Sequence, residues 1–434
     1  MSIEQLYEIF LQCSGVETDS RKAGNNSIFF ALKGERFNGN DFAAEVLAAG
    51  ASCVVVDERR NLPEGKYFLT SDVLSTLQEL AKMHRRRLGL QVVGITGSNG
   101  KTTSKELINS VLSQKYNVVS TKGNLNNHIG VPLTLLSFDQ NTQIGIVEMG
   151  ANHCGEIAKL CEIAMPDSGL ITNIGKAHLE GFGGLEGVVR AKSELYRYLQ
   201  SHGGTIFMHG DNQLLQTSVG PYAHCIRYGG DKKYAASGQV KSRDPYLQIN
   251  LTLDGLSTDV TTQLVGDYNL DNVLAAAAVG QYFGVDLAGI RRGVEEYTPA
   301  NNRSQLVVGV SNTIVMDAYN ANPSSMQASI HNFIELSADG LRKVMILGDM
   351  LELGSFAAEE HQSLTDFLGQ LSGVDIYLVG SNFAGTSVFP SCRQFIDVEA
   401  ISSFIMRHPI RNAHILVKGS RSIQLEKLLE LIAS

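Results

Sequence analysis

Short apolar runs alternate with amphipathic stretches through the middle of the chain. Segments of helical periodicity separate continuous apolar runs at 92–96, 144–148, 168–173 and 205–209. Strands that alternate with helices predict βαβ units and therefore a mostly parallel sheet. Farther along, 246–265 alternates apolar and polar residues around Asp254-Gly255, which predicts an antiparallel hairpin with a two-residue turn, and 269–283 predicts a helix.

The two ends of the chain carry their own α/β patterns. The extended runs 27–32 and 52–57 predict a small α/β domain at the start. The end of the chain predicts a Rossmann-like α/β domain, with strands near 313–317, 343–347, 376–379 and 414–417. The basic run 84–87 is interpreted as a solvated helix end, and the Pro-containing stretch 298–302 as a second linker. We therefore expect three domains, at 1–84, 85–298 and 299–434.

Composition narrows the class of protein. The chain has 434 residues, of which 43% are hydrophobic and 18% charged, so it can build several cores. Its net charge of −8 argues against nonspecific nucleic-acid binding, which needs a positive surface. Six cysteines without a CxxC pair indicate neither a zinc site nor a disulfide framework. Because neither a basic signal-peptide start nor a long apolar run is found, we expect a cytoplasmic protein without membrane insertion. We also expect a monomer.

The clearest chemical signal is a glycine-rich segment between the strand at 92–96 and a helix predicted at 105–112. It consists of Gly97, Ser98, Asn99, Gly100, Lys101, Thr102 and Thr103. Glycines let backbone amides surround phosphate oxygens, the lysine meets β/γ-phosphates, and the hydroxyl of Thr102 can bind Mg²⁺. Ile95 stands where the strict P-loop pattern has a glycine, but strand, Gly-Lys-Thr and helix coincide. The sequence thus predicts a central nucleotide-binding P-loop domain.

Polar residues follow the neighbouring predicted strands. Glu148 ends the strand at 144–148 and is a candidate Mg²⁺ ligand, because ligands of open α/β sheets bind at the carboxyl ends of strands. His178 is either a second metal ligand or a loop cap. From composition, Lys192 in the predicted helix 185–199 belongs to a solvated charged face. The glycines of 181–187 form a poor dinucleotide fingerprint and predict a flexible loop.

Several motifs in order along the chain resemble those of one family. They are the phosphate loop from Thr96, the run Glu148-Met149-Gly150-Ala151, residues 173–180 (NIGKAHLE), 19–21 (DSR), 30–37 (FALKGERF), 268–272 (YNLDN), 317–323 (DAYNANP) and 347–350 (LGDM). On these residues the chain is identified as a member of the Mur ligase family. The segment 317–323 resembles the family member that adds a dipeptide.

The resemblance implies an ATP-driven amide ligase of peptidoglycan precursor synthesis. Its substrates would be UDP-N-acetylmuramoyl-tripeptide, held by the first domain, ATP, held by the middle one, and D-alanyl-D-alanine, held by the last. The acceptor carboxylate would attack the γ-phosphate to give an acyl phosphate, which the amine of the dipeptide then attacks.

The resemblance also assigns roles to individual residues. Thr102 and Glu148 would hold one Mg²⁺, and His178 a second, with Lys101 bridging the phosphates and Lys192 carbamylated as a further metal ligand. The remaining assignments are Asn269, Asn272, Arg303 and Asp317 to ATP, Ser20 and Arg21 to the uridine diphosphate, and Asn320 and Asn322 to the dipeptide. Turn formation ahead of Pro323 is the alternative for the last two. Asn127 would approach the phosphates.

Two other functions remain open at this stage. One is another ligase of the superfamily, such as a folylpolyglutamate synthase. The segments 19–21 and 317–323 argue against it. The other is a catalytically silent nucleotide-binding partner, which would have lost Lys101, Glu148 or His178, whereas all three are present.

Overall fold

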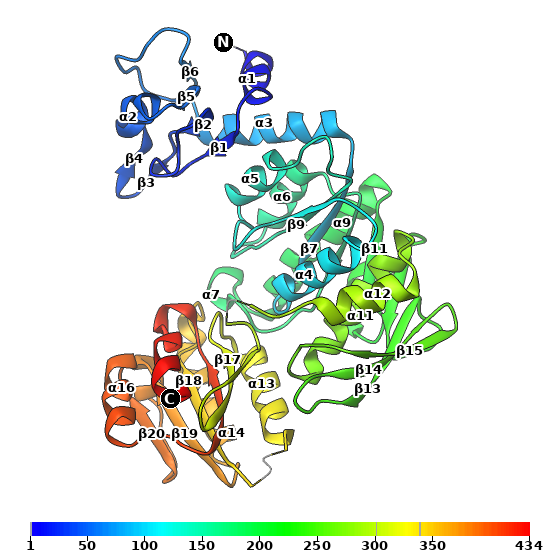
Figure 1. The fold of residues 1–434 in the computed structure, drawn as a ribbon, viewed down its shortest axis with the longest axis vertical. Coiled ribbons are helices and arrows are strands. Elements are labelled where there is room, and N and C mark those ends of the chain that lie inside the picture. The colour runs from blue at the N-terminus through cyan, green and yellow to red at the C-terminus, as the bar shows by residue number, and fades with distance from the viewer. Residues whose placement is uncertain (1, 301, 338–339) are drawn as a thin grey trace.

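The computed structural model describes residues 2–300, 302–337 and 340–434, so Asn301 of the predicted second linker lies outside the described residues. The chain forms three α/β units, each with its own main sheet, arranged one after another along the long axis (Figure 1). Most strands within each main sheet are parallel. The predicted three-domain α/β class is therefore confirmed. Among the described residues, no helix has the length and apolar character needed to cross a membrane.

The first unit is a four-stranded parallel sheet in the order β1-β2-β5-β6, accompanied by a small hairpin. Its elements are α1 (Ile3–Phe10), β1 (Gly15–Glu17), β2 (Ser27–Phe30), β3 (Lys33–Gly34), β4 (Phe37–Asn38), η1 (Gly39–Phe42), α2 (Ala43–Ala48), β5 (Cys53–Val56), β6 (Tyr67–Leu69) and α3 (Val73–Leu88). The runs predicted as strands at 27–32 and 52–57 form β2 and β5, which are buried along their whole length.

Helix α3 leads from the first unit onto the second. It begins where the Asp72 side chain accepts the amides of Leu74 and Ser75, and it ends at Gly89 in the left-handed conformation. The predicted boundary between residues 84 and 85 falls inside this helix.

The interpretation of the run 84–87 as a solvated helix end is wrong for two of its members. His84 and Arg85 are only 3% and 6% exposed. Arg85 donates from Nε to the Ala164 carbonyl at 3.1 Å and pairs with Asp167 at 2.8 Å. Asp167 also accepts the Val92 amide at 2.8 Å. These bonds attach α3 to the start of the central strand, because a charged group is buried only with polar partners.

The second unit contains a nine-stranded sheet in the order β15-β14-β13-β12-β11-β10-β7-β9-β8. Its strands are β7 (Gln91–Thr96), β8 (Val118–Ser120), β9 (Ile144–Glu148), β10 (Ser168–Ile171), β11 (Thr205–His209), β12 (Cys225–Gly229), β13 (Ala236–Ser242), β14 (Gln248–Leu253) and β15 (Leu256–Thr261). Its helices are α4 (Lys101–Leu112), α5 (Gly130–Leu136), α6 (Glu156–Ala164), α7 (Leu179–Phe182), α8 (Leu185–Lys192), α9 (Glu194–His202), α10 (Gln213–Val219), η2 (Asp267–Asn269), α11 (Leu270–Tyr282) and α12 (Leu287–Glu296).

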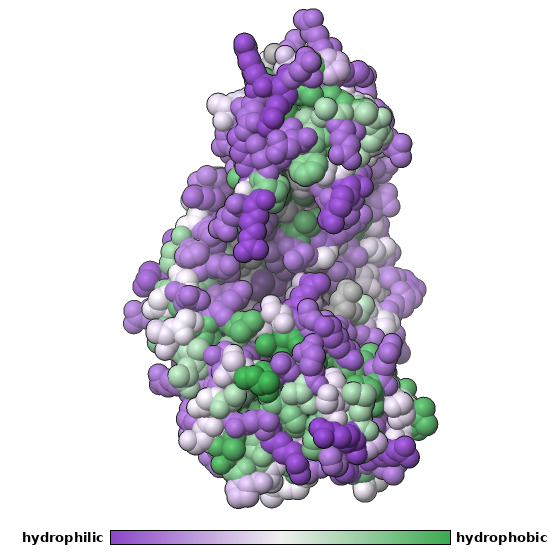
Figure 2. Space-filling model, turned by 90° about the vertical axis from the view of Figure 1, so that its left-hand side faces the viewer, coloured by the Kyte–Doolittle hydropathy of each residue, from purple (hydrophilic) through white to green (hydrophobic). Residues whose placement is uncertain are grey.

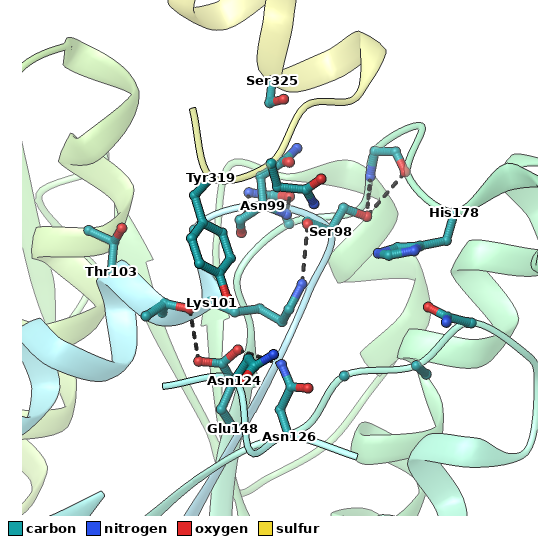
Figure 3. Close-up of a pocket in the computed structure, with 18 of the residues that line it drawn as sticks. Ser98, Asn99, Lys101, Thr103, Asn124, Asn126, Glu148, His178, Tyr319 and Ser325 are labelled. Carbon is teal, nitrogen blue, oxygen red and sulfur yellow. Dashed lines mark hydrogen bonds between the residues drawn. The ribbon is translucent and has the colours of Figure 1, made fainter. Parts of the chain in front are cut away.

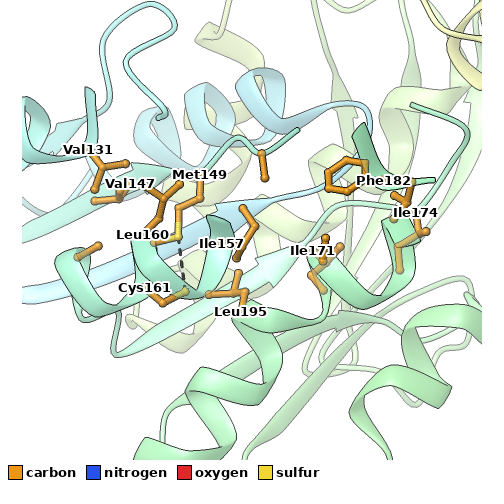
Figure 4. Packing of buried hydrophobic residues seen from close by; sticks show 14 of the residues in the cluster. Val131, Val147, Met149, Ile157, Leu160, Cys161, Ile171, Ile174, Phe182 and Leu195 are labelled. Carbon is orange, nitrogen blue, oxygen red and sulfur yellow. Dashed lines mark hydrogen bonds between the residues drawn. The ribbon is translucent and has the colours of Figure 1, made fainter. Parts of the chain in front are cut away.

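Apolar side chains fill both sides of this sheet. One cluster joins β9 and β10 to α6 and α9, and Figure 4 shows Val147, Met149 and Leu195 packed there. A second cluster joins the other face to α4 and α11. The doubly covered sheet explains why its central strands are continuous apolar runs.

Two local predictions in this unit have opposite outcomes. The hairpin β14–β15 is confirmed, with Asp254 and Gly255 at φ of 48° and 80° in its turn. The flexible loop predicted at 181–187 is wrong, because this segment forms the end of α7, a two-residue turn at Gly183 and Gly184, and the start of α8. A Cβ on Gly187 would lie 1.8 Å from the Phe182 carbonyl oxygen, so this glycine serves close helix packing.

The third unit is a six-stranded sheet in the order β16-β17-β21-β18-β19-β20, with only β16 antiparallel. Its elements are β16 (Gln305–Val308), β17 (Asn312–Asp317), α13 (Pro323–Glu335), β18 (Arg342–Gly348), η3 (Gly354–Phe356), α14 (Ala357–Leu368), β19 (Val374–Val379), α15 (Ser381–Ala384), β20 (Cys392–Phe395), α16 (Val398–Arg407), β21 (Ala413–Lys418), η4 (Arg421–Ile423), η5 (Leu425–Leu428) and α17 (Leu429–Ala433). The predicted strands of this part are all present.

Replacing Asp167 with asparagine removes the carboxylate shared by Arg85 and the Val92 amide. We expect the free energy of unfolding to fall by about 2 kcal/mol, because the buried guanidinium loses its counter-charge. The midpoint of urea unfolding measures the change. Asp375→Asn is the matched control, since its ion pair with Arg342 is exposed on both sides and should contribute less than about 1 kcal/mol. Equal shifts in the two variants would contradict this account.

Candidate active site

A large cleft lies between the carboxyl edge of the nine-stranded sheet and the third unit. Its volume is about 1250 Å³. Figure 2 shows a face that is hollowed near its middle, with hydrophilic residues around the depression. The predicted site residues that line the cleft are Ser98, Asn99, Gly100, Lys101, Thr102, Thr103, Asn127, Glu148, His178, Asn269, Asn272, Arg303, Asp317 and Asn320. The fold thus brings together residues that lie more than two hundred positions apart in sequence.

The phosphate loop is folded tightly against the end of β10. Gly97 has a φ of 147°, and a Cβ there would lie 1.9 Å from Oγ1 of Thr172. The amides of Ser98 and Asn99 donate to the backbone and side-chain oxygens of Asn173, each at 3.0 Å. Gly100, at a φ of 75°, then caps α4, which begins at Lys101 rather than at the predicted residue 105. The amino end of a twelve-residue helix therefore faces the cleft and favours anions.

Lys101 projects from the first turn of this helix. Its Nζ donates to the carbonyl oxygen of Gly97 at 2.7 Å and to that of Ser98 at 3.3 Å, the second of which is drawn in Figure 3. Desolvation lowers the pKa of Lys101, and the nearby Glu148 carboxylate partly opposes that shift. Among the described residues, Lys101 bonds to carbonyl oxygens and has no ion-pair partner, so its charge is available to a phosphate group.

Glu148 is buried, 2% exposed, beside the phosphate loop. Its Oε2 accepts the Thr102 hydroxyl at 3.0 Å, and its Oε1 accepts the Asn126 amide at 2.9 Å. The hydroxyl and carboxylate oxygens are hard donors of the kind Mg²⁺ prefers, so this pair fits the ion. Asn126 was missed by the sequence reasoning, although the asparagine-rich run 124–127 marked its position.

Asn127, the neighbour predicted to approach the phosphates, has a local task. Its Oδ1 accepts the amides of Ile129 and Gly130, at 3.1 and 2.9 Å, where α5 begins. Its side-chain oxygen is therefore engaged in capping the helix.

His178 meets a residue of the third unit across the cleft. Its Nδ1 lies 2.5 Å from Oε2 of Glu352, which is the distance of an ion pair. The two groups are not aligned as a hydrogen bond requires. The imidazole lowers the pKa of Glu352. Both residues have positive φ, 53° and 63°, a conformation that non-glycine residues rarely adopt. Glu352 was missed because no distance in sequence relates it to residue 178.

The burial of Lys192 shows that the prediction of a solvated charged face is wrong. Lys192 is 1% exposed at the end of α8, where its Nζ lies 5.2 Å from the centre of the Phe182 ring. Desolvation, together with the charge of Lys101, lowers the pKa of Lys192 to about 7. The predicted helix 185–199 is in fact two helices that meet at Ser193, and this packing buries the lysine. Lys192 does not line the cleft itself.

The two asparagines of the segment 268–272 form a bonded chain behind the loop. Asn269 donates to the Val265 carbonyl, Asn272 donates to Oδ1 of Asn269, and Ser104 donates to Oδ1 of Asn272, each at 2.9 Å. A Cβ on Gly100 would lie 2.6 Å from that last oxygen. These bonds hold α11 against the phosphate-loop helix.

The third unit presents a second set of charged groups. The Arg303 guanidinium lies 3.5 Å from the centre of the Tyr319 ring. Asp317 pairs with Lys418 at 2.6 Å and accepts the Ser329 hydroxyl at 3.1 Å. Asp317 is therefore neutralised in place by a lysine from the neighbouring strand.

The remaining predicted residues have separate surroundings. Asn322 caps α13 by accepting the Ser325 amide, and its Nδ2 donates to Oδ1 of Asn99 at 2.7 Å. The bond to Asn99 connects the third unit to the phosphate loop. The helix cap agrees with the alternative that Asn322 forms a turn ahead of Pro323. Ser20 and Arg21 lie in the first unit, where Arg21 pairs with Asp19 at 2.7 Å, and neither lines the cleft.

No cluster of three or more His, Cys, Asp or Glu side chains suited to a metal occurs within 2–300, 302–337 and 340–434. Mg²⁺ needs only one or two protein oxygens when substrate phosphates supply the rest, and Thr102 with Glu148 meet that need. Near His178, the available oxygen donor is Glu352.

Comparisons with known proteins agree along the whole chain. Family models described as "Mur ligase family, catalytic domain", "Mur ligase middle domain" and "Mur ligase, glutamate ligase domain" match residues 12–96, 95–280 and 302–421. UDP-N-acetylmuramoyl-tripeptide–D-alanyl-D-alanine ligase of Bacillus subtilis is 34% identical, over 96% of this chain and 92% of the relative.

Solved structures are also similar to this chain over nearly its whole length. MurF from Acinetobacter baumannii superimposes with a TM-score of 0.87 at 30% identity, covering 100% of this chain and 98% of that one. MurF ligase from Thermotoga maritima in complex with ADP superimposes with a TM-score of 0.86 at 27% identity, covering 98% of both chains.

Gly97→Ala tests the close approach of the phosphate loop to Thr172. We expect the affinity for ADP, measured by isothermal titration calorimetry, to fall at least about tenfold, because the loop must move away from Thr172. Gly203→Ala is the control: Gly203 also has positive φ, 71°, but no atom lies within 4 Å of the position that a Cβ would occupy there. A similar loss of affinity in both variants would show that general destabilisation is responsible.

Proposed function

The chain belongs to the Mur ligase family, and we propose that it is the ATP-dependent member that joins D-alanyl-D-alanine to UDP-N-acetylmuramoyl-tripeptide. The main observation in support is that the carboxyl edges of the middle and third sheets face each other across one cleft. The phosphate loop with Glu148 stands on one side, and Arg303 with Tyr319 on the other. The relatives that match over the full length bear the name of this ligase, which favours it over the folylpolyglutamate synthase alternative. A silent nucleotide-binding partner is disfavoured by the intact Lys101, Glu148 and His178.

The reaction must first make a carboxylate electrophilic. In the proposed step, an oxygen of the tripeptide carboxylate attacks the γ-phosphorus of ATP, the bond to the bridging oxygen breaks, and ADP leaves. The amine of the dipeptide then attacks the acyl phosphate and loses a proton, and phosphate departs as the amide forms. Lys101 and the amino end of α4 counter the phosphate charge.

Mg²⁺ fits this proposal through the oxygen atoms of Thr102 and Glu148. His178 and a carbamylated Lys192 would contribute to a second ion. When bound, the ions supply charge neutralisation on the phosphates. By the same proposal Asn269 and Asn272 border the adenine, Arg303 and Asp317 meet ATP from the third unit, Ser20 and Arg21 hold the uridine diphosphate, and Asn320 and Asn322 contact the dipeptide. The domain limits 1–84, 85–298 and 299–434 and the monomeric, cytoplasmic state remain predictions.

The main test is phosphate release from ATP with both substrates, omitting each in turn. We expect release to require the acceptor and the dipeptide together, with the pentapeptide product detected by mass spectrometry. Lys101→Ala should lower the rate about 100-fold or more, because a cation facing the transferred phosphoryl group is lost. Lys122→Ala, an exposed lysine outside the cleft, should be unchanged. Release without either substrate, or none with lysine- and diaminopimelate-containing acceptors alike, would overturn the proposed function.

Lys192 offers a test that depends on pH. Carbon dioxide reacts with the neutral amine, and the lowered pKa of Lys192, about 7, makes that form dominant above pH 7 and minor below it. With ¹³C-bicarbonate, we expect a carbamate signal by NMR that is strong at pH 8, weak at pH 6 and absent in Lys192→Ala. A signal that persists in this variant, or none at pH 8 in the native protein, would contradict carbamylation.

A further inference from the structure

Two arginines approach one tyrosine ring at the mouth of the cleft. The guanidinium of Arg303 lies 3.5 Å from the centre of the Tyr319 ring, and that of Arg421 lies 5.3 Å from it. Tyr319 follows β17, and Arg421 follows the adjacent strand β21, so both come from the carboxyl edge of the third sheet. All three residues line the cleft. The ring therefore has two cations within the range of cation–π attraction, and both line the cleft.

Two carboxylates of the third unit in this cleft are each close to a basic side chain. Asp317 is paired with Lys418 at 2.6 Å, and Glu352 lies 2.5 Å from His178. Within the part of the chain that the structure describes, Arg303 and Arg421 have no carboxylate partner. Two unpaired guanidinium groups in a cleft of a protein with a net charge of −8 indicate sites for anionic ligands.

The two arginines have different neighbours. Arg303 lies near the phosphate loop, where its charge adds to the desolvation that lowers the pKa of Lys101. Arg421 stands after the strand that ends in Lys418, next to the loop that carries Asn320. The Oδ1 of Asn320 accepts the Ala321 amide at 2.9 Å, while its Nδ2 has no hydrogen-bond acceptor among the described residues. An arginine and a free amide donor thus lie on the same wall.

We propose that Arg421, held by Tyr319 and assisted by Nδ2 of Asn320, binds the carboxylate of the incoming dipeptide. This inference rests on the proposed function. A guanidinium presents a planar pair of donors that matches a carboxylate, and the amide supplies one more. A dipeptide is at most about 7 Å long, so its carboxylate must be bound on a wall that also faces the acyl phosphate. Tyr319 and Arg421 line the same cleft as Lys101, as such a site requires.

Kinetics with two forms of the dipeptide test the assignment. D-Alanyl-D-alanine is compared with its carboxyl-terminal amide, which keeps the amine and lacks the negative charge. We expect the native enzyme to use the free acid with a kcat/KM about tenfold or more above that of the amide. Arg421→Ala should raise the KM for the free acid about tenfold and remove most of this preference, with the KM for ATP changed less than about twofold. Arg421→Lys, which keeps the charge without the fork, should be intermediate.

Arg393→Ala is the matched control, because Arg393 is also stacked on an aromatic ring, 5.0 Å from the centre of Phe404, but lies outside the cleft. It should behave like the native enzyme, and ADP affinity checks that each variant is folded. If Arg421→Ala raises the KM for ATP as much as that for the dipeptide, the arginine binds phosphate and the proposal is overturned. It is also overturned if the variant keeps the native preference for the free acid. If the native enzyme joins neither dipeptide, the proposed function itself fails, which is a distinct result.

Discussion

The contact between the phosphate loop and the end of β10 is the constraint on which the rest of the site depends. Gly97 has no room for a side chain because Thr172 occupies that space, and the amides of the next two residues are fixed by Asn173. This contact sets where α4 begins, and so where Lys101 and Thr102 point. Glu148 reaches Thr102 only because β9 is the strand next to β7. A loop held this firmly can present amides to an anion without reorganising.

The first and third units are joined to the middle one by different kinds of contact. The first is attached through the long helix α3, whose buried His84 bonds to the Phe138 carbonyl at 2.8 Å and whose Arg85 is bound to Asp167. The third meets the middle unit through polar contacts, such as Asn322 with Asn99 and Lys176 with Glu360 at 2.6 Å, and through buried apolar side chains, since the cluster that contains Leu179 also contains Leu353.

Charged residues account for the largest errors of the sequence-based predictions. A run of basic residues, or a lysine among other charges, usually belongs to a solvated surface, yet Arg85 and Lys192 are buried. In each case a second element covers the residue: the middle unit covers Arg85, and α7, through Phe182, packs against Lys192. For Lys192, only the family resemblance had pointed to a special role.

The sequence by itself determined the three α/β units, the positions of the central strands, the hairpin at Asp254-Gly255 and the phosphate loop, because each depends on local periodicity or on the backbone freedom of particular glycines. It also placed Glu148 at a strand end. Only the tertiary structure decided the pairing of His178 with Glu352, the capping task of Asn127, and the approach of Arg303 and Arg421 to Tyr319. These contacts join residues from separate strands or separate units. Their distances depend on how sheets twist and pack against each other, which no spacing along the chain records.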